Sequence, residues 1–279
     1  MALVRPRLCF VCAAEAVSQC VRCKAGYYCS RRCQKKHWAA SHKRRCITAA
    51  ERAAFNTPQR RDRLWQAARR NNVAVARDLT LRGVDVNCRD LKTGCTPLYV
   101  AAAHGAIAIV KDLLDAGADK ELTDKNGTYP LHIAAMNGHT AVARALIDAG
   151  AETDRAPNDD CATPLHAAAM NGHEAIVRAL LDAGAETDHT LNKGATPLFV
   201  AAQQGHSAIA RALIDAGADT NIADKEGATP LHMAAQSGHS AVARLLLEAG
   251  ADKTKAAGEW TALKIAEHFG HTAICELLK

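Results

Sequence analysis

The chain has 279 residues, of which 35 are Lys or Arg and 29 are Asp or Glu. Charge divides it in two: up to Arg63, 15 basic residues face 3 acidic ones, a net of +12, and the remainder has 20 against 26, a net of −6. We therefore expect two domains. A signal peptide's apolar core and a bilayer-spanning stretch are both missing, so we expect an intracellular protein, cytoplasmic or nuclear, with no membrane segment.

The first 46 residues hold most of the cysteines, seven of 11, and these form close pairs with one another or with histidine. The pairs are Cys9 and Cys12, Cys20 and Cys23, Cys29 and Cys33, and His42 and Cys46. In a reducing compartment such a cluster indicates a metal site rather than disulfides. Eight ligands are enough for two tetrahedral zinc ions. Because protein then fills every coordination position, we expect both ions to be structural.

Spacing alone leaves the grouping of these pairs open, since they can be used in order or interleaved. A helix expected over residues 30–45, with Ser30 as its N-cap, places ligands that are separated by three residues on one face. His37 is an alternative ligand one turn after Cys33. We favour His42 because it pairs with Cys46 on one helix face.

The cysteine and histidine spacing, together with Tyr28-Cys29-Ser30, Cys33-Gln34 and His37-Trp38, resembles the MYND-type zinc finger over nearly its whole length. In that family the pairs interleave. The resemblance implies one zinc held by Cys9, Cys12, Cys29 and Cys33 and a second held by Cys20, Cys23, His42 and Cys46. It also implies that Gln34 and Trp38 hold short proline-containing peptides, although Trp38 equally suits the core of so small a domain.

Basic residues crowd the predicted finger helix and allow a different function, that of a nucleic-acid-associated transcriptional regulator. They are Arg31, Arg32, Lys35, Lys36, Lys43, Arg44 and Arg45. Part of this charge balances the thiolates around zinc, and the aromatic set of a single-strand reader is missing. We therefore favour a peptide partner. A third alternative is a ubiquitin-ligase-like adaptor, built on a RING-like cross-brace.

We expect the finger over residues 1–46, a linker over 47–59 and a second domain over 60–279. The dipeptide Thr57-Pro58 is interpreted as a helix-ending signal near this boundary.

The second domain repeats one phrase, Thr-Pro-Leu-His or a close variant, every 33 or 34 residues, starting at Thr96, Tyr129, Thr163, Thr196 and Thr229. Two ladders of glycine follow the same period. Within each unit, Thr can cap a helix, Pro suits its first turn, paired Ala keep one face thin, and Gly ends it. Short helices of this kind persist only by stacking, so the period predicts a solenoid.

Together these features resemble the ankyrin repeat. We expect a mainly α fold of about seven helix-turn-helix units beginning near residues 60, 94, 127, 160, 194, 227 and 260. The first and last units depart from the phrase, as caps that face water would. Tyr129 should weaken one cap, Cys161 in place of Gly should alter one hairpin, and an extra residue within 155–160 should bulge a loop outward.

Two series of histidines recur with the repeat. Because the phrase recurs where no single site needs it, we interpret them as capping or inter-repeat hydrogen bonds rather than as a metal site or proton relay. The positions that vary between units are those left free for a partner. On the first helices the predicted contacts are His104, Met136, Asn137, Met170, Asn171, Gln203, Gln204 and Gln236.

No phosphate loop, activated nucleophile or carboxylate pair stands out from the repeats, so we expect no enzyme. The sequence favours a monomeric adaptor or scaffold, in which the finger binds a peptide and the repeats bind a second protein.

Overall fold

The computed structural model describes residues 18–19, 27–28, 55–157 and 162–279. The eight predicted zinc ligands, Gln34, Trp38, the expected finger helix and Cys161 lie outside the described residues. Two short strands precede the repeats: β1 (Ser18–Gln19) pairs antiparallel with β2 (Tyr27–Tyr28). Ser18 lies opposite Tyr28, and Gln19 lies opposite Tyr27.

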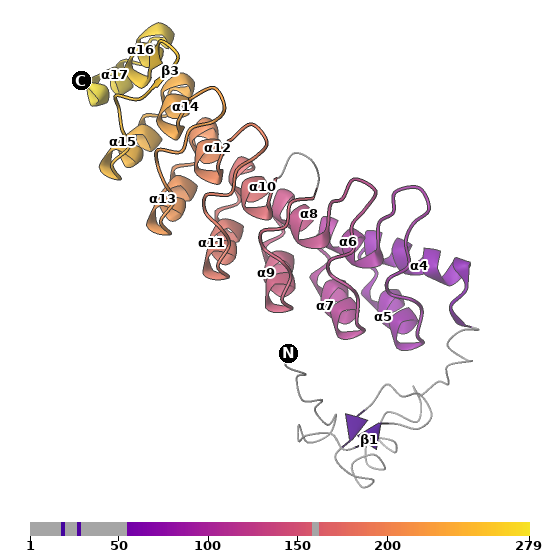
Figure 1. Cartoon of the computed structure of the whole chain (residues 1–279). Coiled ribbons are helices and arrows are strands. Elements are labelled where there is room, and N and C mark those ends of the chain that lie inside the picture. Colours follow the sequence, from indigo (N-terminus) through magenta and orange to yellow (C-terminus); the bar gives the residue numbers. More distant parts are fainter. Residues whose placement is uncertain (1–17, 20–26, 29–54, 158–161) are drawn as a thin grey trace.

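From residue 55 on, the described residues form seven pairs of helices. The first helices of the pairs are α4 (Pro58–Arg69), α6 (Pro97–Ala103), α8 (Pro130–Met136), α10 (Pro164–Met170), α12 (Pro197–Gln204), α14 (Pro230–Ser237) and α16 (Ala262–Phe269). The second helices are α5 (Val73–Leu81), α7 (Ile107–Asp115), α9 (Thr140–Asp148), α11 (Glu174–Asp182), α13 (Ser207–Asp215), α15 (Ser240–Glu248) and α17 (Thr272–Leu278). Figure 1 shows the two kinds of helix in parallel rows of one elongated stack. The predicted solenoid of seven units is confirmed.

Threonine caps begin the first helices as the sequence predicts. The Oγ1 atoms of Thr96 and Thr196 accept hydrogen bonds from the backbone N–H groups of Tyr99 and Phe199, each at 3.1 Å. Proline follows in the first turn, where its missing N–H costs no helical hydrogen bond. Tyr129 makes no side-chain cap at the start of α8, which confirms the predicted weak cap.

The first unit begins differently from the sequence-based expectation. Thr57 and Pro58 were interpreted as ending a helix, but they start α4: the Thr57 side chain accepts from the Arg60 N–H, and Pro58 is the first helical residue. A proline disfavours helical geometry in the residue before it, which suits an N-cap as well as a helix end. The helix therefore reaches two residues into the expected linker.

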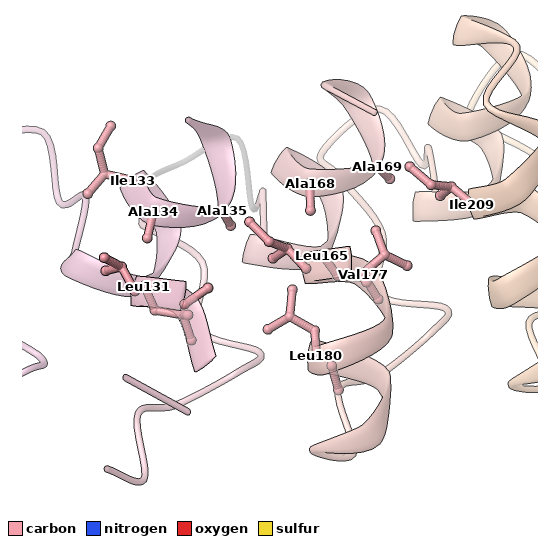
Figure 2. Packing of buried hydrophobic residues seen from close by; sticks show 14 of the residues in the cluster. Leu131, Ile133, Ala134, Ala135, Leu165, Ala168, Ala169, Val177, Leu180 and Ile209 are labelled. Atoms are coloured by element: carbon pink, nitrogen blue, oxygen red, sulfur yellow. The ribbon is translucent and has the colours of Figure 1, made fainter. Parts of the chain in front are cut away.

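A continuous apolar core runs through the stack. Leu131, Ala134, Leu165, Ala168 and Leu180 are fully buried, and Figure 2 shows them pointing from neighbouring helices into shared space. Because alanine has no side chain beyond Cβ, consecutive first helices can approach closely at these positions. Each unit buries its apolar face only against its neighbours, as the solenoid requires.

The last unit ends the stack with polar residues. Lys264 and Glu267 are exposed on α16, where the third to sixth units place a buried histidine or phenylalanine ring and a buried alanine. This confirms the predicted cap. Its hairpin is formed by β3 (Ala256–Ala257), which pairs antiparallel with β4 (Trp260–Thr261). Among the described residues no helix is both long and apolar enough to cross a bilayer.

Candidate partner-binding surface

Two residues at the end of the first helix of every unit lie on the surface, all of them exposed except the half-buried Ala103. In the first six units they follow a pair of alanines, and in the seventh they follow Ala266-Glu267. We name these fourteen residues the variable row: Arg69 and Arg70, Ala103 and His104, Met136 and Asn137, Met170 and Asn171, Gln203 and Gln204, Gln236 and Ser237, and His268 and Phe269. The first helices pack against one another in order, so the row runs the length of the array. All eight predicted contact residues of the repeats fall on it.

Met136 and Met170 are the large apolar side chains in the middle of the row. They end the adjacent helices α8 and α10 and are 41% and 46% exposed. Most of the long apolar side chains around them lie in the core, so this exposure is not forced by the fold. Methionine is flexible and polarisable, which suits an adaptable contact surface.

Other predicted contact residues have local roles as well. His104, Asn137 and Asn171 are the C-cap residues of their helices. The Asn137 amide donates to the Ala103 carbonyl at 3.0 Å, and the Asn171 amide donates to the Ala167 carbonyl at 2.8 Å. Part of their polar capacity is therefore already used within the array.

The glutamines of the row differ from these caps. Gln203, Gln204 and Gln236 are exposed, and within the part of the chain that the structure describes their side chains make no hydrogen bond. Their amides are free to bind a partner.

Sequence reasoning missed an exposed aromatic cluster in the last unit. The rings of Trp260 and His268 lie 5.3 Å apart, and those of His268 and Phe269 lie 5.1 Å apart, both edge to face. Trp260 is 46% exposed and Phe269 is 51% exposed. The position of His268 and Phe269 within the repeat could have indicated that they are exposed. They follow Ala266-Glu267 as Met136 and Asn137 follow Ala134-Ala135.

Sequence reasoning also missed the cationic start of the row. Arg69 and Arg70 are exposed and form no ion pair with any described residue. The Arg69 guanidinium lies 5.8 Å from the Trp65 ring, a cation–π contact on the same helix. The sequence did carry a signal for these arginines. They follow the paired alanines Ala67 and Ala68 directly, as the exposed residues of the later units follow theirs.

The first histidine series is buried and structural. In α10, Nδ1 of His166 accepts from Thr163 Oγ1 at 2.9 Å, and Nε2 donates to the Ala195 carbonyl of the next unit at 3.2 Å. Burial lowers the pKa of His166 to about 4, so the ring is neutral at pH 7. His132 has the same pKa direction and value, but its Nδ1 has no partner because Tyr129 replaces the threonine.

The second histidine series links each unit to the one before it. Nε2 of His139 lies 3.0 Å from the Ala103 carbonyl, and equivalent contacts join His173 to Met136 at 3.2 Å and His239 to Gln203 at 3.1 Å. These bonds confirm the predicted inter-repeat role. Each ends on a backbone carbonyl of the variable row, so the stacking contact also holds the row in place.

The periodic acidic residues also serve the backbone. Asp154 accepts from the backbone N–H of Glu186 at 2.8 Å, and Asp188 accepts from that of Asp219 at 3.1 Å, each one unit later. Among the residues that the structure describes, no three His, Cys, Asp or Glu side chains are grouped closely enough to hold a metal ion. Burial raises the pKa of the Cys88 thiol to about 11 and raises that of Cys95.

Comparison with family models finds two matches. The model described as ankyrin repeats matches overlapping segments from residue 36 to residue 279. The model described as a MYND finger matches residues 9–46, the segment that holds all eight predicted ligands. MYND fingers bind zinc, so the second match assigns zinc binding to this segment.

A solved structure, the human ASB11 ankyrin repeat domain, has the same fold. It aligns with a TM-score of 0.70 and 28% identity, covering 77% of this chain and 97% of that one. A palmitoyltransferase, AKR1 of Lachancea kluyveri, is 37% identical over 73 residues. That match covers 26% of this chain and only 10% of the transferase, so it reaches a small part of that protein.

Proposed function

We propose that this chain, which belongs to the ankyrin-repeat family and carries an N-terminal MYND finger, is an adaptor or scaffold that holds two protein partners together. Both modules are protein-interaction modules, and the ankyrin fold typically provides binding surface rather than catalysis. The exposed pair Met136 and Met170 carries the proposal for the repeats, because it sets an apolar patch among polar residues with free amides. Joining two binding modules raises the effective concentration of their partners.

For the finger we propose two structural zinc ions, the first on Cys9, Cys12, Cys29 and Cys33 and the second on Cys20, Cys23, His42 and Cys46. The match to the MYND finger model over residues 9–46 and the four close pairs of ligands support this proposal.

We propose that the finger binds a proline-containing peptide through Gln34 and Trp38. The test is affinity capture with the full zinc-loaded chain beside two variants, Trp38→Ala and Met136→Ala/Met170→Ala. The adaptor proposal expects each variant to lose a different partner and keep the other. If both variants keep every partner, or if both lose the same one, two independent binding surfaces are not present.

Nucleic-acid binding is the competing outcome, and the net charge of +12 up to Arg63 is the observation that favours it. An oligonucleotide that binds the full chain with an affinity falling steeply with salt, and that is lost on charge reversal at Arg44 and Arg45 with zinc retained, would support that function. Binding that is insensitive to these changes supports the peptide.

A further inference from the structure

The variable row differs chemically from one end of the array to the other. Of its fourteen residues, the ones that carry a full charge at pH 7 are Arg69 and Arg70, both exposed in the first unit. From the second unit to the sixth the row holds only Ala, His, Met, Asn, Gln and Ser, with no Lys, Arg, Asp or Glu. In the seventh unit it ends in the aromatic cluster of Trp260, His268 and Phe269.

These three regions lie along one line. The helices α4, α6, α8, α10, α12, α14 and α16 pack consecutively, and Figure 1 shows them side by side in one row. Packed helices lie about 8–10 Å apart, so the six steps from α4 to α16 span roughly 50–60 Å. An extended polypeptide rises about 3.3 Å per residue, so about 15–18 residues reach from the arginines to the aromatic cluster.

We propose that the variable row binds one extended polypeptide segment in a fixed direction. Its acidic end lies over Arg69 and Arg70, its apolar residues lie over Met136 and Met170, and its other end contacts Trp260 and Phe269. The inference rests on the proposed function and adds the chemistry and the direction of the partner. Charge complementarity at one end fixes the register, while the apolar and aromatic contacts supply most of the buried surface.

A nucleic acid fits the row less well than such a segment. Its phosphates repeat along the whole strand and need a cation at each step, whereas the row is cationic in the first unit alone. Lysines on the hairpins, such as Lys92 and Lys193, lie outside the row. The test therefore includes an oligonucleotide as a competitor of the peptide.

The test selects random peptides of about 18 residues, displayed on phage, against the full zinc-loaded chain. We expect the enriched peptides to carry acidic residues toward one end and apolar residues in the middle. The variant Arg69→Glu/Arg70→Glu should weaken their binding at least tenfold. The matched control Arg144→Glu/Arg244→Glu makes the same change of net charge on α9 and α15, away from the row, and should weaken it less than twofold.

Three further measurements fix the direction of the bound segment. Replacing the peptide's acidic residues by Lys should restore binding to Arg69→Glu/Arg70→Glu relative to the original peptide, because the charges are then complementary again. The variant Trp260→Ala/Phe269→Ala, checked for folding by circular dichroism, should weaken binding through the opposite end. A photo-crosslinker at the acidic end should label the first unit, and one at the other end should label the seventh.

The inference is overturned by several results that leave the proposed function intact. Peptides that depend on Met136 and Met170 but not on Arg69 and Arg70 would bind the row without the proposed direction. A folded protein captured by the chain, with no peptide enriched, would show that the row recognises a surface and not a segment. Equal losses in the two charge-reversal variants, or an oligonucleotide competing for Arg69 and Arg70, would also overturn it. If no partner of any kind binds, both proposals fail.

Discussion

The imidazole of His173 lies against Gly138 of the preceding unit. A Cβ atom placed on Gly138 would stand 2.6 Å from Cε1 of that ring, closer than real Cβ atoms approach another heavy atom. Four equivalent pairs recur along the array, among them His139 on Gly105 and His271 on Gly238. In the second to sixth units, the glycine after the first helix therefore has two roles: it adopts a positive φ, and it leaves room for the histidine that joins the units.

These two roles can be separated by substitution, because Gly150 has the same φ of +76° as Gly138 but meets nothing within 4 Å of its added Cβ. Gly150→Ala should cost about 1–2 kcal/mol, the cost of a left-handed backbone for an L-residue. Gly138→Ala should cost about 1–3 kcal/mol more, because the added methyl displaces His173. Urea unfolding of both variants measures the difference, and equal losses would show that the ring contact contributes nothing.

Two buried histidines at equivalent positions offer a second matched comparison. His166→Phe removes the hydrogen bonds to Thr163 and Ala195, so it should lower the free energy of unfolding at pH 7 by about 1–3 kcal/mol. His132→Phe removes a ring whose Nδ1 has no partner, and it should cost less than about 1 kcal/mol.

Phe199 shows that the array accepts this side chain, since it occupies the same place in the fifth unit and is 7% exposed. Thermal or urea unfolding of the two variants decides the comparison. If His132→Phe loses as much stability as His166→Phe, then His132 must make a stabilising hydrogen bond in the folded protein, and the prediction is wrong.

Stability should fall in mild acid because of these rings. Burial lowers the pKa of His132 to about 4, below the ordinary value of 6.5, so between these values the unfolded chain binds more protons than the folded one. The stability that comes from keeping these rings neutral is fully present above about pH 6.5. It is lost as the pH falls toward 4, at up to about 1.4 kcal/mol per pH unit for each such histidine.

The variant His132→Phe isolates one of these histidines. Its stability relative to the natural chain should rise as the pH falls from 6.5 to 4, while above pH 7 the two curves should run parallel. Parallel curves over the whole range would mean that His132 titrates normally in the folded protein.

The repeats could be predicted in detail because each unit states the same pattern again. The caps, the positive-φ glycines and the buried alanines of α8, α10 and α12 follow from residues that recur in phase, and a single exception such as Tyr129 stands out against them. Where a unit departs from the pattern, its helix boundaries were harder to predict. Thr57-Pro58 was assigned to a helix end because the first unit lacks the full phrase, although the same dipeptide starts four other helices, α6, α10, α12 and α14.

The candidate surface was predictable where the units agree and not at the two ends. His268 and Phe269 escaped notice because the last unit is shorter and lacks Thr-Pro-Leu-His, which hides their equivalence to Gln236 and Ser237. The contact of His268 with Trp260 joins a helix to a hairpin, which no local spacing indicates. The partner of Tyr129 was equally hidden: its hydroxyl donates to the Arg155 carbonyl at 2.6 Å, 26 residues away.

The proposed grouping of zinc ligands predicts the spectra of cobalt-substituted variants. Both groupings contain one site with four cysteines and one with three cysteines and a histidine, and they differ in which pair shares an ion with His42. With interleaved pairs, Cys20→Ser disrupts the histidine-containing site and leaves the four-cysteine site, whereas Cys29→Ser leaves the histidine-containing one. With sequential pairs the two outcomes exchange. The d–d bands of Co²⁺ bound at one equivalent report which ligand set remains, since thiolate and imidazole ligands split the d orbitals differently.

His42→Cys serves as the control, because it should convert only the histidine-containing site to four thiolates. Combined with Cys29→Ser it should shift the remaining bands, and combined with Cys20→Ser it should leave them unchanged. Because the array from α4 onward packs through its own core, its helical circular dichroism and unfolding midpoint should be the same in every one of these variants. Bands that shift in the Cys20→Ser background would reject the interleaved grouping in favour of the sequential one.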